Sequence, residues 1–174
     1  MMKRILACIL TVGLLLLSLT ACQTERSDLV FYVIKAEDLP ADAAESTLLS
    51  IAKEQGRVAF TGAEIERWHW EEQQVDLKEP NVRGGSGNTG SSLFQADAED
   101  AFLLALGNEV LYFGGFKNDV GAMTLDRDPY IADLSTGTAF SLRCHHTYEA
   151  GEDPRRNDTL YDFLASFNLL ASDS

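Results

Sequence analysis

Hydrophobic residues recur along this chain in two patterns, one with the spacing of β-strands and one with the spacing of α-helices. The continuous apolar run at residues 29–34 predicts a strand that is covered on both faces. Alternation over residues 64–77 predicts a hairpin, or a turn followed by a strand. Shorter apolar runs predict further strands at residues 58–60, 101–105, 109–114, 129–131 and 139–144.

Two segments have helical spacing instead. In residues 41–55 the apolar side chains form one stripe, and Gly56 is placed to end the helix. In residues 158–170 they form a second stripe, and Asn157 or Asp158 is placed to cap it. The stripes consist of Ala44, Leu48, Ile51 and Ala52, and of Leu160, Phe163, Leu164 and Phe167.

The connections between these segments indicate how the domain is organised. Gly107-Asn108 lies between two apolar runs and predicts a tight hairpin. Residues 79–92 include a Gly- and Ser-rich run with almost no apolar side chains, which predicts a flexible loop. Residues 28–78 are few for a separate domain. We therefore expect a single α+β domain, with a mostly antiparallel sheet of five or six strands and two helices.

The first 22 residues have a pattern of their own. Lys3 and Arg4 give a basic start, residues 5–19 are mostly apolar, and the segment ends in Leu-Thr-Ala-Cys at 19–22. The apolar run is shorter than the roughly 20 residues of a membrane-spanning helix, so the pattern predicts a secretory signal peptide. This segment resembles the signal peptide and lipobox of bacterial lipoproteins.

The resemblance implies that residues 1–21 are removed and that Cys22 becomes the lipid-bearing N-terminus. Residues 22–27 are then the lipidated cysteine and a short tether, and residues 28–174 are the ectodomain. The implied location is the extracytoplasmic face of a cell membrane. For a Gram-negative source the inner and the outer membrane both stay open. The implied partner is the membrane, bound through the lipid on Cys22.

The charge of the chain changes what the ectodomain is expected to bind. Removing residues 1–21 takes away Lys3 and Arg4, so 12 basic and 27 acidic residues remain, with a formal charge of −15. This charge disfavours nucleic acid as a partner, because phosphate binding needs clusters of Lys and Arg. With Cys22 acylated, Cys144 has no partner for an intramolecular disulfide. We expect Cys144 to be a half-buried strand residue.

Cys144-His145-His146 is the densest group of metal-ligating residue types. Neighbouring residues on a strand point to opposite faces, and a zinc site needs three or four ligands. His69 is the only other histidine in the chain. The sequence therefore predicts no metal site and no cofactor.

Trp68 and Trp70 are the candidate binding residues. Two positions apart on a strand, they share one face, with His69 on the other and Arg67 beside them. Paired indoles can contact a protein partner or stack on a sugar ring. The alternative is that one or both indoles fill the core beneath the sheet.

Two short segments carry a further resemblance. Residues 64–70, with an acidic-Ile-x-x-aromatic-x-Trp pattern, and residues 153–158, which lead into the last helix, are similar to elements of small secreted bacterial domains. In the second segment Arg156 is an additional residue. This resemblance implies no activity.

Together these features favour a membrane-anchored envelope lipoprotein. Its ectodomain is expected to be a non-catalytic binding or structural module for a protein or an envelope glycan. The alternative is an envelope hydrolase that uses His146 or His69 with an acidic partner. The chain has no nucleophile motif accompanied by its partner motifs, so no catalytic residue is assigned.

Overall fold

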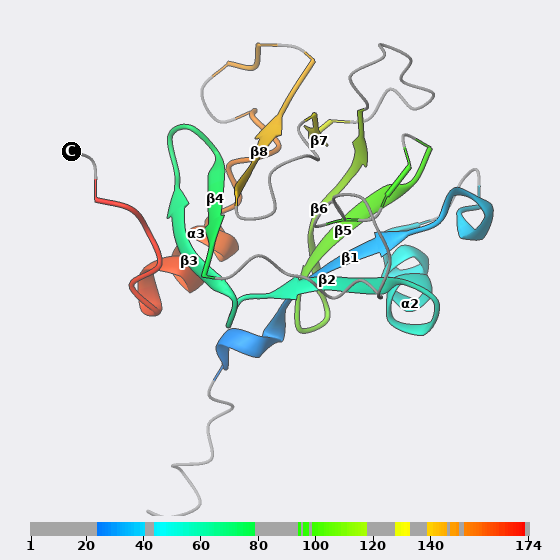
Figure 1. Cartoon of the computed structure of the whole chain (residues 1–174), viewed down its shortest axis with the longest axis horizontal. Helices are drawn as coiled ribbons and strands as arrows, with labels where there is room; N and C mark the ends of the chain where they lie inside the picture. Colours follow the sequence, from blue (N-terminus) through cyan, green and yellow to red (C-terminus); the bar gives the residue numbers. More distant parts are fainter. Residues whose placement is uncertain are drawn as a thin grey trace, which may run out of the picture.

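The computed structural model describes residues 24–40, 44–78, 94, 96–97, 99–117, 128–132, 139–145, 147–149 and 152–172 (Figure 1). The predicted signal peptide, Cys22, the predicted loop at 79–92 and His146 lie outside these residues. Within the described ranges, no helix has the length and apolar character of a membrane-crossing segment.

The described residues form an α+β fold with one mostly antiparallel sheet and two α-helices, as the sequence predicts. The sheet has eight strands in the order β2-β1-β5-β6-β7-β8-β4-β3, and β6 with β7 is the parallel pair. The strands are β1 (Leu29–Ile34), β2 (Arg57–Thr61), β3 (Ile65–His69), β4 (Gln74–Leu77), β5 (Ala101–Leu106), β6 (Glu109–Phe116), β7 (Tyr130–Ile131) and β8 (Ala139–Arg143). The helices are α2 (Glu45–Glu54) and α3 (Asp158–Ser166), with short 3₁₀ turns η1 (Arg26–Asp28) and η2 (Ala36–Asp38).

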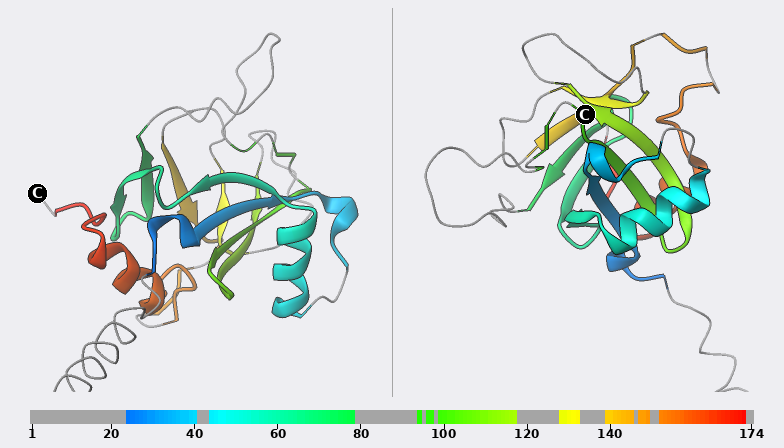
Figure 2. Two further views of the ribbon diagram at one scale, coloured as in Figure 1. Left: turned by 90° about the horizontal axis from the view of Figure 1, so that it is seen from below. Right: turned by 90° about the vertical axis from the view of Figure 1, so that its right-hand side faces the viewer.

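The prediction of five or six strands is wrong. All eight strands lie in segments that the sequence marks as strand or hairpin, so the error lies in how many of them join one sheet: β4 pairs with β8, and two-residue β7 lies between β6 and β8. The sheet curls until it is nearly barrel-shaped (Figure 2). Strands β2 and β3 stand at opposite ends of the strand order, yet they are joined by the short turn at residues 62–64.

The curled sheet encloses an aromatic core. Phe31 stacks on Phe60 and Phe102, with ring centroids 4.8 and 5.1 Å apart, and meets Phe140 of β8 at 5.9 Å. Helix α3 adds its apolar stripe to the same core. Helix α2 covers the other side of the sheet, where its stripe packs on Tyr32, Ile34, Leu103 and Ala105. Strand β1 is therefore covered on both faces, which confirms the prediction from its continuous apolar run.

The ends of the helices follow local sequence signals only in part. Asn157 caps α3, because its Oδ1 accepts a hydrogen bond from the Leu160 amide at 2.9 Å. The helix ends at Ser166 rather than continuing to residue 170. Beyond it the chain runs along the edge of β3, where the Trp68 amide donates to Leu169 O at 2.8 Å. Pairing with a distant strand edge thus takes over from helix propagation.

The start of the fold lies slightly earlier than expected. Arg26 and Ser27, which were expected in the tether, belong to η1. The Arg26 guanidinium donates to Phe167 O at 2.7 Å, and the Gly107 amide donates to Asp28 O at 3.0 Å. These two contacts tie η1 to the end of α3 and to the β5–β6 turn.

Gly114 of β6 gives a test of the close approach between β6 and the start of β7. A Cβ at this position would overlap the Pro129 carbonyl oxygen and lie 2.5 Å from the Phe102 ring. Gly114→Ala should lower the free energy of unfolding by about 2–3 kcal/mol, because the backbone and a core ring must both move. Urea denaturation measures this loss.

Gly107→Ala is the matched control. Its Cβ meets nothing within 4 Å, and only its φ of +60° disfavours a side chain. The expected cost is about 1 kcal/mol. Equal losses for the two variants would contradict the close approach.

Candidate functional site

Trp68 is a core residue. Its side chain is 1% exposed and belongs to the aromatic core inside the sheet. Its indole Nε1 finds no hydrogen-bond partner among the described residues. The prediction of a surface built from both Trp68 and Trp70 is therefore wrong, and the alternative of a core indole holds for Trp68.

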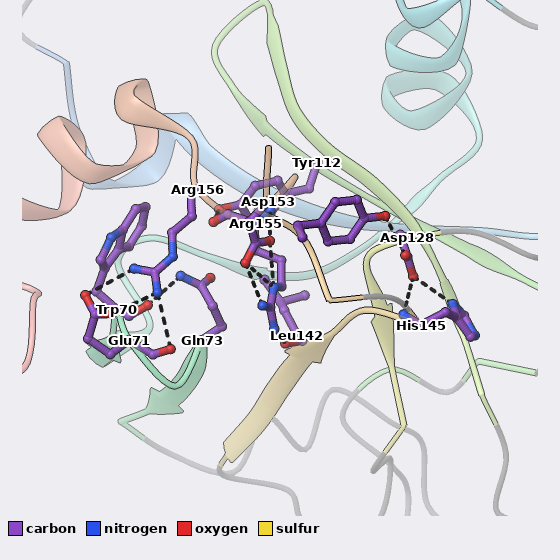
Figure 3. A network of polar contacts seen from close by, with 11 residues as sticks. Trp70, Glu71, Gln73, Tyr112, Asp128, Leu142, His145, Asp153, Arg155 and Arg156 are labelled. Atoms are coloured by element: carbon purple, nitrogen blue, oxygen red, sulfur yellow. Dashed lines mark hydrogen bonds and ion pairs between the residues drawn. The ribbon is translucent and has the colours of Figure 1, made fainter. Parts of the chain in front are cut away.

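Trp70 lies elsewhere, because β3 ends at His69 and Trp70 begins the turn to β4. Its half-buried indole lies 5.1 Å from the Tyr161 ring of α3, at an interplanar angle of 70°. Tyr161 is 42% exposed, and among the described residues it is the large hydrophobic side chain that is classed as exposed. The Arg156 guanidinium lies over the Trp70 ring, 5.6 Å from its centroid (Figure 3).

Glu71 completes this group by binding Arg156 in a fork. Arg156 NH2 lies 2.9 Å from one Glu71 carboxylate oxygen, and NH1 lies 3.2 Å from the other. The hydrogen bonds and the charge of Arg156 lower the pKa of the Glu71 carboxyl below its ordinary value. We call Trp70, Glu71, Arg156 and Tyr161 the aromatic surface.

The turn that carries Trp70 and Glu71 is held by Gln73. This side chain is fully buried, and its Nε2 donates to Trp70 O at 2.6 Å. The backbone of Gln73 has a φ of +53°, and its carbonyl accepts a hydrogen bond from the Leu142 amide at 2.9 Å. Gln73 thus fixes the turn to β8, and Trp70 with it.

Arg156 is positioned by the residues just before it. Arg155 pairs with Asp153 through Nε and NH2, at 2.8 and 2.6 Å, and reaches Leu142 O of β8 at 3.3 Å. The Tyr112 hydroxyl of β6 donates to the carbonyl of Arg155. These contacts attach the segment before α3 to two strands of the sheet (Figure 3). The partners of Trp70 are therefore arranged in advance.

Arg67, the third predicted binding residue, has a different partner. It is exposed, and its guanidinium donates to Asn168 O at 2.9 Å. This bond holds the segment after α3 against β3. Of the three predicted binding residues, Trp70 is therefore the one that belongs to the aromatic surface.

Two histidines lie beside carboxylates. His69 Nε2 is 2.8 Å from Asp76 Oδ2 across the β3–β4 pair. His145 Nδ1 is 2.7 Å from Asp128 Oδ1, and the Tyr148 hydroxyl donates to Asp128 Oδ2 at 2.7 Å. Of the two histidines named for the alternative function, His69 lies beside an acid, and His146 lies outside the described residues.

Cys144 adjoins the second pair in sequence. It is half-buried, as the sequence predicts, but it follows β8, which ends at Arg143, and is not a strand residue. Burial raises the pKa of its thiol to about 11, with Asp128 and Asp153 adding to the rise and Arg155 opposing it. A thiol of that pKa is protonated at neutral pH, which disfavours a cysteine nucleophile. Among the described residues, no three His, Cys, Asp or Glu side chains are grouped as metal ligands.

Comparisons with protein-family models, with curated proteins and with solved structures find no match to this chain. The site therefore rests on its own geometry. Sequence reasoning missed Arg156 and Tyr161. The signal for Tyr161 is its place off the apolar stripe of the last helix, where an aromatic residue has no core to fill.

Asp128 gives a pH-dependent test of the loop geometry. Burial raises the pKa of its carboxyl, but hydrogen bonds from Tyr148 and His145 and the charge of His145 outweigh this and lower it. A lowered pKa means that the carboxylate stabilises the fold above its ordinary pKa of 3.8 and that this stabilisation is lost as the pH falls further. Asp128→Asn should lower the free energy of unfolding by about 2 kcal/mol at pH 7.

The difference between wild type and Asp128→Asn should shrink in urea denaturation as the pH is lowered from 4 towards 2. Asp162→Asn, at an exposed position of α3, is the control and should change little. A pH-independent difference would show that Asp128 does not act through its charge.

Proposed function

We propose that this chain is a lipid-anchored, extracytoplasmic binding module that holds a protein partner on its aromatic surface. The observation that carries the proposal is the contact of Trp70 with Tyr161 and Arg156. Trp and Tyr are among the residues that most often dominate the energy of protein interfaces.

The fixed geometry of the aromatic surface supports a binding role. The turn carrying Trp70 is held by Gln73, and Arg156 follows the pair formed by Asp153 and Arg155. A partner that contacts Trp70 does not have to order the turn that carries this ring, and a binding site that is arranged in advance loses less conformational entropy.

The position of Arg156 favours a protein over a glycan. The Trp70 ring already lies against a charged guanidinium, and guanidinium groups come from protein side chains and not from sugars. The arrangement of an aromatic ring, a cation and a paired carboxylate is typical of contacts between protein side chains.

The lipid anchor is proposed from the first 22 residues. With a lipid on Cys22, the fold would begin at η1, four residues later. Because Arg26 ties η1 to Phe167 at the end of α3, the domain would be held close to the bilayer rather than on a long stalk.

The hydrolase remains a second candidate because of His69 and Asp76. Their separation of 2.8 Å is that of an imidazole oriented by an acid. Within the described residues, no Ser, Thr or Cys side chain hydrogen-bonds to the His69 ring. A hydrolase would lose its activity in His69→Gln, measured on envelope glycan and peptide substrates, whereas Trp70→Ala would retain it.

The lipid anchor predicts a modified Cys22. Mass spectrometry of the protein from its native membrane should find a mature chain that begins at Cys22 and carries acyl chains. Cys22→Ser should keep the leader and lack the lipid. An unmodified thiol at position 22 in the native host would contradict the anchor, without bearing on the aromatic surface.

The aromatic surface predicts a contact that can be trapped. A photocrosslinking amino acid at Ala165, which is exposed one turn beyond Tyr161, should give a protein adduct in intact envelopes. Trp70→Ala with Tyr161→Ala should reduce the adduct at least tenfold, as expected when interface hot spots are truncated.

The same crosslinker at Glu54, on the exposed side of α2, is the control and should give no specific adduct. An adduct that disappears on digestion with a glycan hydrolase would instead identify an envelope glycan. An adduct unaffected by the double variant would contradict a role for the aromatic surface.

A further inference from the structure

We propose that the aromatic surface recognises an arginine side chain in a cationic segment of its protein partner. The inference rests on the proposed function and specifies the chemistry of the partner. It follows from what already occupies the surface, from the charges around it and from the geometry of the guanidinium group.

Arg156 is an internal occupant of the site. Trp70 contributes its ring and Glu71 contributes two carboxylate oxygens, and both act on one guanidinium (Figure 3). A ring face and a carboxylate fork are the two groups that select arginine in proteins. The chain therefore shows which ligand chemistry Trp70 and Glu71 accept.

Arg156 can leave this position without unfolding its segment. Its backbone amide is held by Asp153 O at 2.9 Å, and the segment is fastened by Arg155 rather than by Arg156. The Arg156 side chain is 30% exposed and its carboxylate partner is 64% exposed. Ion pairs with this exposure exchange at small cost, because water screens both partners.

The rim around the aromatic surface is acidic. On α3, Asp158, Tyr161 and Asp162 are exposed and lie three and four residues apart, so they share one helix face. Glu72, beside Glu71 in the turn, is also exposed. Arg156 is the cation of the aromatic surface, and its displacement would leave Glu71 as the charged member of that set.

This charge pattern fits a cationic partner and repels an acidic one. A patch with aromatic residues at its centre and carboxylates at its rim gains both contact area and electrostatic complementarity from Arg-bearing segments. The formal charge of −15 on residues 22–174 adds long-range attraction in the same direction.

Arginine is favoured over lysine by the shape of the site. The two Glu71 oxygens are bound by two nitrogens of one planar group, which an ammonium group cannot reproduce. A planar guanidinium also stacks on an indole while it keeps these hydrogen bonds. Two peptides of equal charge can therefore be told apart.

The experiment measures binding of fluorescein-labelled hexaarginine and hexalysine to the full chain in detergent, by fluorescence anisotropy. Hexaarginine should bind at least fivefold more tightly than hexalysine. Arg156→Gln should strengthen hexaarginine binding about fivefold, because it removes the internal competitor. Glu71→Gln should weaken it by a similar factor, because the fork is lost.

Matched controls separate the site from the general charge. Arg143→Gln removes one exposed cation from β8, and Glu54→Gln removes one exposed carboxylate from α2. Each changes the net charge as much as its counterpart and should change affinity less than twofold. Circular dichroism confirms that all four variants are folded.

The outcomes divide clearly. If Arg156→Gln behaves like Arg143→Gln, or if hexalysine binds as well as hexaarginine, arginine recognition is overturned. If Arg156→Gln weakens binding, Arg156 is itself a contact for the partner and the inference is also overturned. In either case a protein adduct at Ala165 that depends on Trp70 and Tyr161 would leave the proposed binding function standing.

Discussion

The packing of Phe31 and Phe60 against Phe140 is the contact on which the rest of the structure depends. Phe31 and Phe60 come from β1 and β2, whereas Phe140 comes from β8, which lies four positions from β1 in the strand order. Their rings meet only if the sheet curls across its own inner face. Burying these rings offsets the entropy lost in closing the sheet.

The closed sheet sets the position of the aromatic surface. Once β8 is in place, β4 pairs with it and the Gln73 carbonyl binds the Leu142 amide. Arg155 reaches the Leu142 carbonyl, so the segment before α3 is fastened to the same residue of β8. The turn that carries Trp70 and the segment that carries Arg156 are therefore both hydrogen-bonded to β8, which places them next to each other.

The charges of the described chain are arranged in small local groups rather than in one network. Lys35 binds Asp100, Arg155 binds Asp153, and each pair fastens a loop to the fold. The pair of Arg156 and Glu71 differs, because Glu71 is exposed, Arg156 is partly exposed and an indole lies beside them. An exposed pair of this kind contributes little to stability, which agrees with a role in binding rather than in folding.

The sequence by itself determined the elements whose signals are local. The apolar run of β1, the hairpin at Gly107 and the cap at Asn157 each depend on a few neighbouring residues, and the structure has all three. The α+β class and the mostly antiparallel sheet follow from the order of such elements.

The tertiary structure alone decided how the strands pair in one sheet and where the site lies. Residues two apart share a face of a strand only while the strand continues. Strand β3 ends at His69, so Trp68 and Trp70 do not share a face. The partners of Trp70 come from positions 156 and 161, far along the chain, and local spacing carries no information about such contacts. Which indole is buried was therefore decided by how the sheet closes, because burial depends on every strand at once.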